Sequence, residues 1–250
     1  MNKNLLLTYW SSPDIARNKE VLDTISKNIE LNVFNTITIF TEINSDKDIN
    51  KFKSKKVEII VDSRKTYQDI FNYSNVIFSS SDCVNILANS DIEFDESINV
   101  AESISEKDFF ALTRYDRNTN ELQKGYLKDL SDSQDVWIWR GFNFLQNCNF
   151  YLGIPGCDNK IAFNAFDGGY TVRNPSKTIK TYHNHLTESR TGTSKNLNMR
   201  IERPYCYLKP THIDEKFVIC TEETEAKPVL FKVDEDLWEY IKSQKEKYSN

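Results

Sequence analysis

Short apolar runs recur through the first 95 positions of the chain, and a polar or helical stretch follows each of them. Runs of four or five residues rich in Leu, Ile and Val are typical of buried strands. The pattern predicts strands at residues 5–8, 36–40, 57–61 and 84–88.

Helices are predicted between these strands at 15–30 and 66–73, with Ser12 or Asp14 as a cap for the first. The polar, lysine-rich stretch 44–56 is expected to be an exposed helix or loop. In the first helix, the apolar residues at helical spacing are Ile15, Val21, Leu22, Ile25 and Ile29.

The second half of the chain shows the same signals less regularly. A turn with two glycines and a proline, 153–159, precedes a predicted helix at 160–166, which Gly168-Gly169 would end. An amphipathic helix is predicted at 235–247. Further short strands are predicted at 109–113, 136–139, 170–172 and 179–182.

This alternation of strands and helices predicts an α/β fold with a mixed, mainly parallel central sheet flanked by helices. Ligands of such sheets bind beyond the carboxyl ends of the strands. The first strand lacks a following glycine-rich turn, which argues against a dinucleotide-binding domain and a methyltransferase. The polar residues at the predicted strand ends are Thr8, Tyr9, Glu42, Asp62, Arg64, Asn89 and Asp91.

Length and charge narrow the class of protein. The 250 residues fit one large domain, and the net charge of −5 makes a nucleic-acid partner unexpected. No apolar run is long enough for a transmembrane segment, and the N-terminus lacks the features of a signal peptide. The five cysteines form no CxxC pair, so a reducing, cytoplasmic setting is expected.

The acidic segment after the fourth strand is the first candidate site. Asn89, Ser90 and Asp91 would project from the strand end into the ligand crevice. Mg²⁺ and Mn²⁺ bind carboxylate oxygens and bridge them to substrate phosphates, which predicts a metal and diphosphate site. From the local sequence alone, a turn or helix-cap role for Asp91 and Asp95 is an equal alternative.

Asp158 is the second candidate. The glycine-containing turn could aim its carboxylate into a pocket, where it would deprotonate an acceptor hydroxyl as a general base. The alternative is that Asp158 caps the following helix, a contribution of about 1 kcal/mol.

Two more segments carry candidate residues. His183 and His185 are two apart at a strand end, so they would face the same side and could complete a metal site. Arg190 could pair with a phosphate. In the segment 135–140, one of Trp137 and Trp139 could stack on a sugar ring, while the other is expected in the core.

Together these pieces resemble the GT-A class of glycosyltransferases, and within it a group of viral and bacterial enzymes that includes a chlorovirus (algal-virus) rhamnosyltransferase-type domain. The resemblance spans about residues 4–190. It rests on seven segments in the expected order: Leu5-Leu-Leu-Thr-Tyr9, Arg64-Lys-Thr-Tyr67, Ala88-Asn-Ser-Asp-Ile92, Ala111-Leu-Thr-Arg114, Ser133-Gln-Asp-Val-Trp-Ile138, Gly156-Cys-Asp-Asn159, and Asn174-Pro-Ser-Lys177 with Tyr182-His-Asn-His185.

The resemblance implies a GT-A-like, Rossmann-type domain at 1–195, with a nucleotide-binding half at 1–95 and an acceptor half at 96–195. Residues 196–250 would be a C-terminal extension packed on it. Thr8, Tyr9 and Arg64 would contact the nucleotide of a nucleotide-sugar donor, with UDP, GDP and dTDP all open. Glu42, at the end of the second strand, is predicted to bind the donor with them.

In the same resemblance, Asn89-Ser-Asp91 corresponds to the DxD motif that holds a divalent metal and the diphosphate. Asn replaces the first Asp, so the metal, Mn²⁺ or Mg²⁺, would depend on Asp91 with help from His183 or His185. Asp158 would be the acceptor-side base of an inverting enzyme, although the sequence leaves inversion or retention open. The residues expected to bind substrate are Arg114, Asp135, Trp137 and Asn159.

The sequence hypothesis is therefore a hexosyltransferase that moves a sugar from a nucleotide-diphosphate sugar to a hydroxyl of a glycan acceptor. Two alternatives remain: a non-catalytic nucleotide- or sugar-binding module, and a sugar nucleotidyltransferase. The second usually places a glycine- and lysine/arginine-rich loop after the first strand, where this chain has Tyr9-Trp-Ser-Ser-Pro-Asp14.

Overall fold

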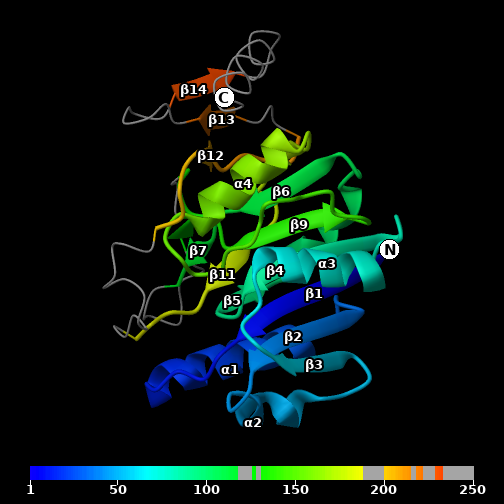
Figure 1. Cartoon of the computed structure of the whole chain (residues 1–250), viewed down its shortest axis with the longest axis vertical. Coiled ribbons are helices and arrows are strands. Elements are labelled where there is room, and N and C mark those ends of the chain that lie inside the picture. The colour runs from blue at the N-terminus through cyan, green and yellow to red at the C-terminus, as the bar shows by residue number, and fades with distance from the viewer. Residues whose placement is uncertain (118–125, 128–130, 188–199, 215–217, 222–228, 233–250) are drawn as a thin grey trace.

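The computed structural model describes residues 1–117, 126–127, 131–187, 200–214, 218–221 and 229–232. Their centre is a seven-stranded sheet in the order β10-β6-β9-β4-β1-β2-β3 (Figure 1). Its strands are β1 (Asn2–Tyr9), β2 (Thr36–Glu42), β3 (Val57–Asp62), β4 (Cys83–Asn89), β6 (Asp108–Leu112), β9 (Val136–Arg140) and β10 (Thr171–Arg173).

All neighbouring strands of this sheet are parallel except β9, which runs antiparallel to both β4 and β6. The prediction of an α/β fold with a mixed, mainly parallel sheet flanked by helices is confirmed. Strand pairing extended five of the eight predicted strands by one to four residues, because the ladder continues wherever a neighbouring strand can pair.

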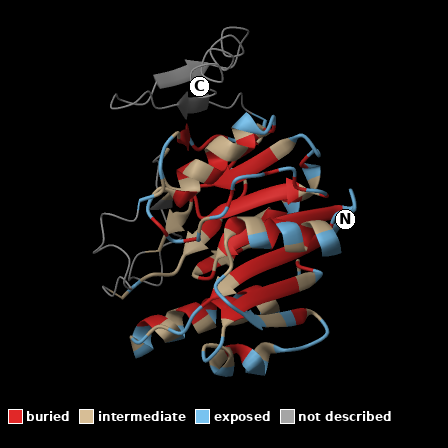
Figure 2. Cartoon of the chain, viewed as in Figure 1, coloured by how far each residue is buried: buried red, intermediate tan, exposed pale blue. Residues whose placement is uncertain are grey.

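Side chains alternate between two cores, one on each face of the sheet. Leu6, Leu87 and Trp139 face α3 (Tyr67–Ile77) and α4 (Cys157–Asp167). Leu5, Leu7 and their neighbours face α1 (Ile15–Glu30) and the 3₁₀ helix η2 (Glu96–Ser103). Figure 2 shows the result, with buried strands between helices that are buried on one side only. Two covered faces explain why the strands read as continuous apolar runs.

The predicted helix at 15–30 is confirmed, but Ile15 was wrongly placed on its inner face. Ile15 is 86% exposed, since it lies six positions before Val21, and at 3.6 residues per turn this offset puts the two side chains on different faces of the helix. Asp14 is the cap, accepting from the backbone N–H groups of Ala16 and Arg17. The residues buried on this helix are Arg17, Val21, Thr24, Ile25 and Asn28.

The smaller elements complete the described chain. The stretch 44–56 forms α2 (Asp46–Ile49) and the short 3₁₀ helix η1 (Asn50–Phe52). A second sheet has the order β5-β11-β7-β8, formed by β5 (Ile92–Phe94), β11 (Thr181–His183), β7 (Tyr115–Asp116) and β8 (Tyr126–Leu127). A third contains β12 (Cys206–Leu208), β13 (Val218–Thr221) and β14 (Val229–Lys232).

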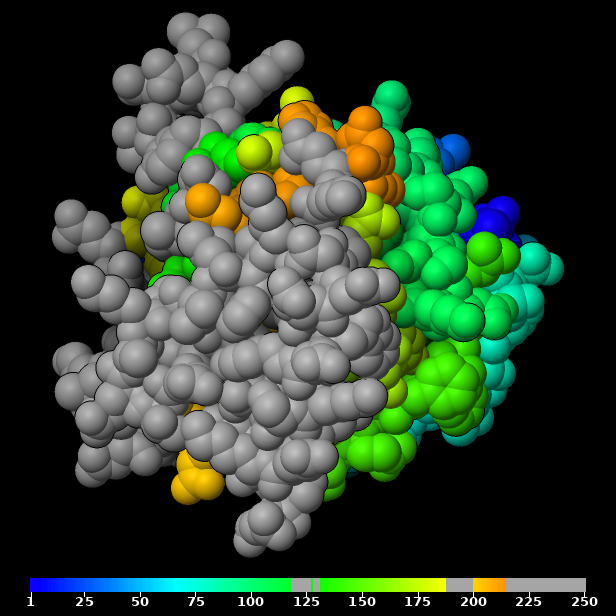
Figure 3. All heavy atoms as spheres, turned by 90° about the horizontal axis from the view of Figure 1, so that it is seen from above, coloured from blue at the N-terminus to red at the C-terminus, as the bar shows by residue number. Residues whose placement is uncertain are grey.

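Residues of the segment 200–214 pack against the central sheet and α4. Cys206 and Leu208 join the core beneath α4, and the backbone N–H of Leu208 donates to the carbonyl of Ser131 at 2.9 Å. In Figure 3, seen from above, this orange segment lies among green parts of the chain. The domain boundary at 195 stays a prediction. The predicted helix at 235–247 and Arg190 lie outside the described residues.

Candidate active site

The chain reverses its direction across the sheet between β1 and β4. From β1 it runs outward to β2 and β3, then returns to place β4 on the other side of β1. The carboxyl ends of strands at such a switch point border the ligand crevice of α/β sheets. Thr8 of β1 is in register with Asn89 of β4, so the predicted nucleotide site and the predicted metal and diphosphate site both begin at this point.

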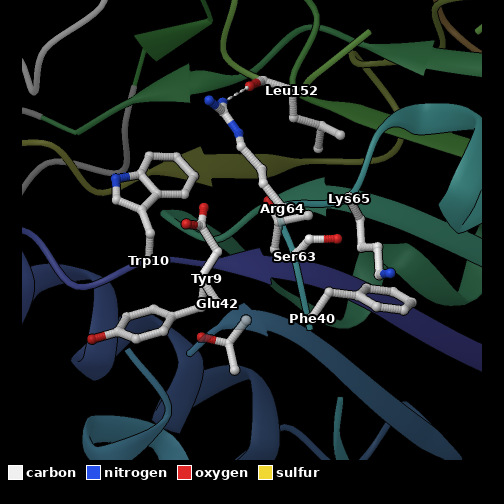
Figure 4. Close-up of a pocket in the computed structure, with 10 residues that line it drawn as sticks. Tyr9, Trp10, Phe40, Glu42, Ser63, Arg64, Lys65 and Leu152 are labelled. Atoms are coloured by element: carbon white, nitrogen blue, oxygen red, sulfur yellow. Dashed lines mark hydrogen bonds between the residues drawn. The ribbon is translucent and has the colours of Figure 1, made fainter. Parts of the chain in front are cut away.

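A narrow cavity lies at the ends of β1, β2 and β3. Thr8, Tyr9, Glu42 and Arg64, all predicted nucleotide contacts, line it together with Trp10. Figure 4 shows Trp10, Glu42 and Arg64 pointing to the same side of the sheet edge. The Arg64 guanidinium donates to the carbonyl of Leu152 at 2.7 Å and lies 5.9 Å from the centre of the Trp10 ring.

Tyr9 contributes less to this cavity than its position in the sequence suggests. It is 2% exposed, and its phenol points away from Arg64 (Figure 4). The hydroxyl donates to Asp48 Oδ2 at 3.0 Å and lies 2.8 Å from Asn18 Oδ1. Burial and the bond to Asp48 raise the pKa of Tyr9 to about 12. The exposed aromatic face here belongs to Trp10, which the sequence analysis did not select.

A second cavity of about 350 Å³ opens beside the ends of β4, β6 and β9. All the residues predicted to bind substrate line it, and so do the predicted base and one predicted diphosphate contact: Arg114, Asp135, Trp137, Asn159, Asp158 and Asn89. The antiparallel direction of β9 explains this grouping. Its first residues, not its last, lie at the carboxyl edge of the parallel strands, so Asp135 is brought beside Asn89.

Asp158 lies in the first turn of α4, one residue after the helix begins. The N-cap is Gly156, so Asp158 is not the cap residue of this helix, although its carboxylate accepts hydrogen bonds from backbone N–H groups of the first turn. Gly156 has a φ of +85°, and a Cβ there would lie 2.5 Å from Tyr205 Oη, so only glycine fits this turn. The Asp158 carboxylate accepts from the backbone N–H of Gln134 at 3.3 Å.

The electrostatic surroundings of Asp158 suit a base. Burial, followed by the negative charge of Asp135, raises the pKa of Asp158 from 3.8 to about 7. Backbone N–H groups oppose this change, but they do not offset it. Strongly perturbed carboxylates in a cleft are typical of catalytic sites.

Arg114 and Asp135 form the polar wall of the second cavity. Their Nη1 and Oδ2 atoms are 2.5 Å apart, and Arg114 Nε also donates to Asp116 Oδ1 at 3.0 Å. These carboxylates outweigh burial and raise the pKa of Arg114 above its usual range. Asn89 donates through Nδ2 to the remaining Asp135 oxygen, Oδ1, at 2.8 Å. The wall is therefore fixed in place before any ligand binds.

The other predicted residues of this region have structural partners. Asn159 is 2% exposed and donates to Gln134 Oε1 at 3.2 Å. Trp137 is 1% exposed and packs edge-on against Tyr67, so its ring face is not open for stacking on a sugar. Ser90 is buried and lines neither cavity described above.

Asp91, His183 and His185 come together although 92 residues separate the first two. One oxygen or nitrogen of each lies within 4.8 Å of the others. This arrangement results from the antiparallel pairing of β5 with β11. The pairing sets His183 opposite Ile92, the residue after Asp91. One carboxylate and two imidazoles fit a mixed oxygen and nitrogen site, a donor set that Mn²⁺ accepts better than Mg²⁺ does.

Hydrogen bonds orient two members of this group. His183 lies between Asp91 Oδ2, 3.2 Å from Nε2, and Asp116 Oδ1, 3.1 Å from Nδ1. Burial alone would lower the pKa of His183, but the two carboxylates raise it to about 9. The pKa of Asp91 is held below its usual range, because its bonds to His183 and Arg17 outweigh the effect of burial.

Several of these partners were missed from the sequence. Arg17 and Glu20 face inward from α1, and their spacing with Val21, Thr24 and Asn28 marks them as part of the buried face. Buried charged residues on an apolar helix face are rare enough to be a signal. Asp116 gives no comparable signal, because it becomes significant only through its contact with His183.

None of the described helices has both the length and the apolar character that crossing a bilayer needs. No family model matches the chain, and no curated protein matches it. Solved structures do share part of the fold. A fragment of S. aureus TarS is 10% identical, with a TM-score of 0.47, and the match covers 73% of this chain and 60% of the fragment.

Two further similar structures are a CTP transferase and a synthase. The inositol-1-phosphate CTP transferase from T. maritima is 12% identical with a TM-score of 0.36, over 56% of this chain and 71% of that one. The 4-diphosphocytidyl-2C-methyl-D-erythritol synthase from Anaerococcus prevotii is also 12% identical with a TM-score of 0.36, over 51% and 62%. The narrower likeness to the chlorovirus group stays a prediction.

Proposed function

We propose that the protein is a glycosyltransferase that moves a sugar from a nucleotide-diphosphate sugar to a hydroxyl of a glycan or similar acceptor. The observation that carries the proposal is Asp158, a carboxylate with a pKa of about 7 in a cavity that adjoins the switch point of the sheet. A base is most effective when its pKa lies near the working pH, and such a base contributes about 10²–10⁴ to the rate.

In this proposal the nucleotide of the donor binds in the first cavity and its sugar binds in the second. The nucleotide lies across the ends of β1 to β3, with Trp10 as a stacking face and Glu42 and Arg64 as polar contacts. The free volume there is about 20 Å³, enough for about one water. Trp10 and Arg64 would therefore turn outward as the nucleotide enters, which their exposure to solvent allows.

The sugar and acceptor occupy the cavity beside Asp158. Arg114 and Asp135 orient their hydroxyl groups, and Asp158 takes the proton from the attacking hydroxyl as its oxygen bonds to the anomeric carbon. The bond between that carbon and the diphosphate breaks, and the nucleoside diphosphate leaves. Attack from the face opposite the leaving group would invert the anomeric centre.

Asp91, His183 and His185 would hold a divalent metal ion beside the diphosphate. When bound, the ion would offset the negative charge that develops on the leaving diphosphate. Asp116 connects this group to the sugar cavity, because its Oδ1 lies 3.0 Å from Arg114 Nε, on the cavity wall, and 3.1 Å from His183 Nδ1. We expect the protein to carry out this reaction in the cytoplasm.

Sugar nucleotidyl transfer is the main competing reaction, and the chemistry of Asp158 argues against it. The nucleophile in nucleotidyl transfer is a sugar phosphate, whose oxygens are already ionised at neutral pH, since the second pKa of a phosphate is about 6. Such a nucleophile needs no base. A hydroxyl does need one, which favours glycosyl transfer.

The test is to incubate the protein with Mn²⁺, a panel of UDP-, GDP- and dTDP-sugars and a mixture of glycan acceptors. Release of nucleoside diphosphate with formation of a glycoside supports the proposal. In a parallel incubation with nucleoside triphosphates and sugar phosphates, release of pyrophosphate contradicts the proposal. If UDP, GDP and dTDP all fail to raise the melting temperature, with and without Mn²⁺, donor binding itself is excluded.

A further inference from the structure

An arginine buried on the first turn of α1 touches both chain segments that carry the candidate metal ligands. Arg17 is 7% exposed. Its Nη2 donates to Asp91 Oδ2, and its Nη1 donates at 2.8 Å to the carbonyl of Asn184, the residue between His183 and His185. One guanidinium therefore joins the end of β4 to the chain that leaves β11.

Glu20, one turn further along the same face, extends this connection. Its Oε2 lies 3.0 Å from Arg17 Nη1, so the charge of the buried guanidinium is balanced. Its Oε1 accepts from the backbone N–H groups of Leu186 and Thr187, at 3.1 and 2.9 Å. Together Arg17 and Glu20 fix residues 184–187 to the helix.

The contact with Asp91 uses only one of its two oxygens. Oδ2 receives Arg17 and His183, whereas Oδ1 accepts no hydrogen bond within the described part of the chain. A carboxylate held by one oxygen presents the other in a fixed direction. Groups that hold metal-ligating side chains in this way change metal affinity by about 10–100-fold when they are replaced.

We propose that Arg17 is a positioning residue for the metal site, orienting Asp91 Oδ1 and aligning it with the two histidines. The inference rests on the proposed function only in requiring that the three residues bind a divalent ion. It gives α1 a role beyond covering the sheet, because the helix carries the residue that fixes both halves of the ligand set.

The test measures binding of Mn²⁺ to the full chain by isothermal titration calorimetry, without nucleotide. Arg17→Met keeps the aliphatic stem and removes the charge and the donors. We expect its Kd for Mn²⁺ to rise about 10–100-fold. Lys27→Met is the matched control, since Lys27 lies on the same helix, pairs with Glu93 at 3.0 Å and does not bond to Asp91. Its Kd should change by less than about threefold.

Arg17→Lys separates geometry from charge, and it carries the test if Arg17→Met does not fold. A single ammonium group lacks the planar fork that bonds to Asp91 and Asn184 at once, so we expect an intermediate Kd in a protein with a native melting curve. The electron paramagnetic resonance spectrum of Mn²⁺ bound to Arg17→Lys should also differ from that of Mn²⁺ bound to the wild type.

An unchanged Kd in Arg17→Met, or full recovery in Arg17→Lys, would overturn the inference and leave the metal site standing. A tighter Kd in Arg17→Met would also overturn it, because Arg17 would then compete with the ion for Asp91. If the wild-type protein itself binds no Mn²⁺, the metal site of the proposed function is wrong, and the inference fails with it.

Discussion

Replacing Asp158 by asparagine should make the protein more stable and nearly inactive. The pKa of this carboxyl is raised from 3.8 to about 7 by burial and by Asp135. Between about pH 4 and 7 the folded protein thus keeps a proton that the unfolded chain has lost, and the free energy of unfolding falls as the pH rises. Each pKa unit corresponds to about 1.4 kcal/mol, so the total loss is about 4 kcal/mol.

Asparagine has no charge to bury, so Asp158→Asn should lack this loss. Its free energy of unfolding should exceed that of the wild type by an amount that grows from pH 4 to 7 and approaches about 4 kcal/mol above pH 7. Urea unfolding at several pH values measures the difference. Asp132→Asn is the matched control, because Asp132 lines the same cavity but is exposed.

The same variant tests catalysis. In the wild type, kcat/KM should rise about tenfold per pH unit below about 7 and level off above it, since this ratio reports the free enzyme's base. Asp158→Asn should lose about 10²–10⁴ in kcat while donor binding is retained. A stability difference that is flat with pH would refute the pKa argument, and wild-type turnover in the variant would refute the assignment of the base.

Three further predictions follow from the site. The pKa of His183 is raised from 6.5 to about 9, so its ion pairs stabilise the protein fully below about pH 6.5, and this stabilisation is lost as the pH rises through about 9. His183→Gln should remove this pH dependence, which amounts to about 3 kcal/mol in the free energy of unfolding measured in urea. Gly156→Ala should cost about 1–3 kcal/mol in unfolding free energy and lower kcat, because the strained turn and the contact with Tyr205 displace Asp158. Arg114→Met should destabilise the protein by about 3 kcal/mol in thermal or urea unfolding, because Asp135 would lose its cationic partner; an unchanged midpoint would mean that the pair contributes nothing.

The strands and helices of the first 95 residues were predictable because their side chains are buried on fixed faces. Leu5, Leu6 and Leu7 alternate between the two cores, and only a strand covered on both sides gives an unbroken apolar run. Their carboxyl ends then pointed to Thr8, Tyr9, Glu42 and Arg64 in the first cavity and to Asn89 in the second, before any strand pairing was known.

Long-range partners were not predictable in the same way. Trp137 is equally consistent with a core or a binding role until its contact with Tyr67 is known. The pKa of Asp158 depends on Asp135, which is 23 residues away and reaches it only because β9 is antiparallel. Helical spacing places Arg17 on the buried face of α1, but its contacts with Asp91 and Asn184 depend on how α1 packs and were not predictable from the sequence.

The asparagine at position 89, where the motif it resembles has aspartate, is explained by its neighbours. Asn89 Nδ2 donates to Asp135 Oδ1 at 2.8 Å, and a carboxylate in its place would bring two negative oxygens into contact. Like charges at this distance cannot both ionise easily. A further negative charge beside Asp135 would also raise the pKa of Asp158 above about 7 and leave the proposed base protonated at neutral pH. Asparagine at 89 and a base at 158 that titrates near neutrality are therefore parts of one electrostatic arrangement.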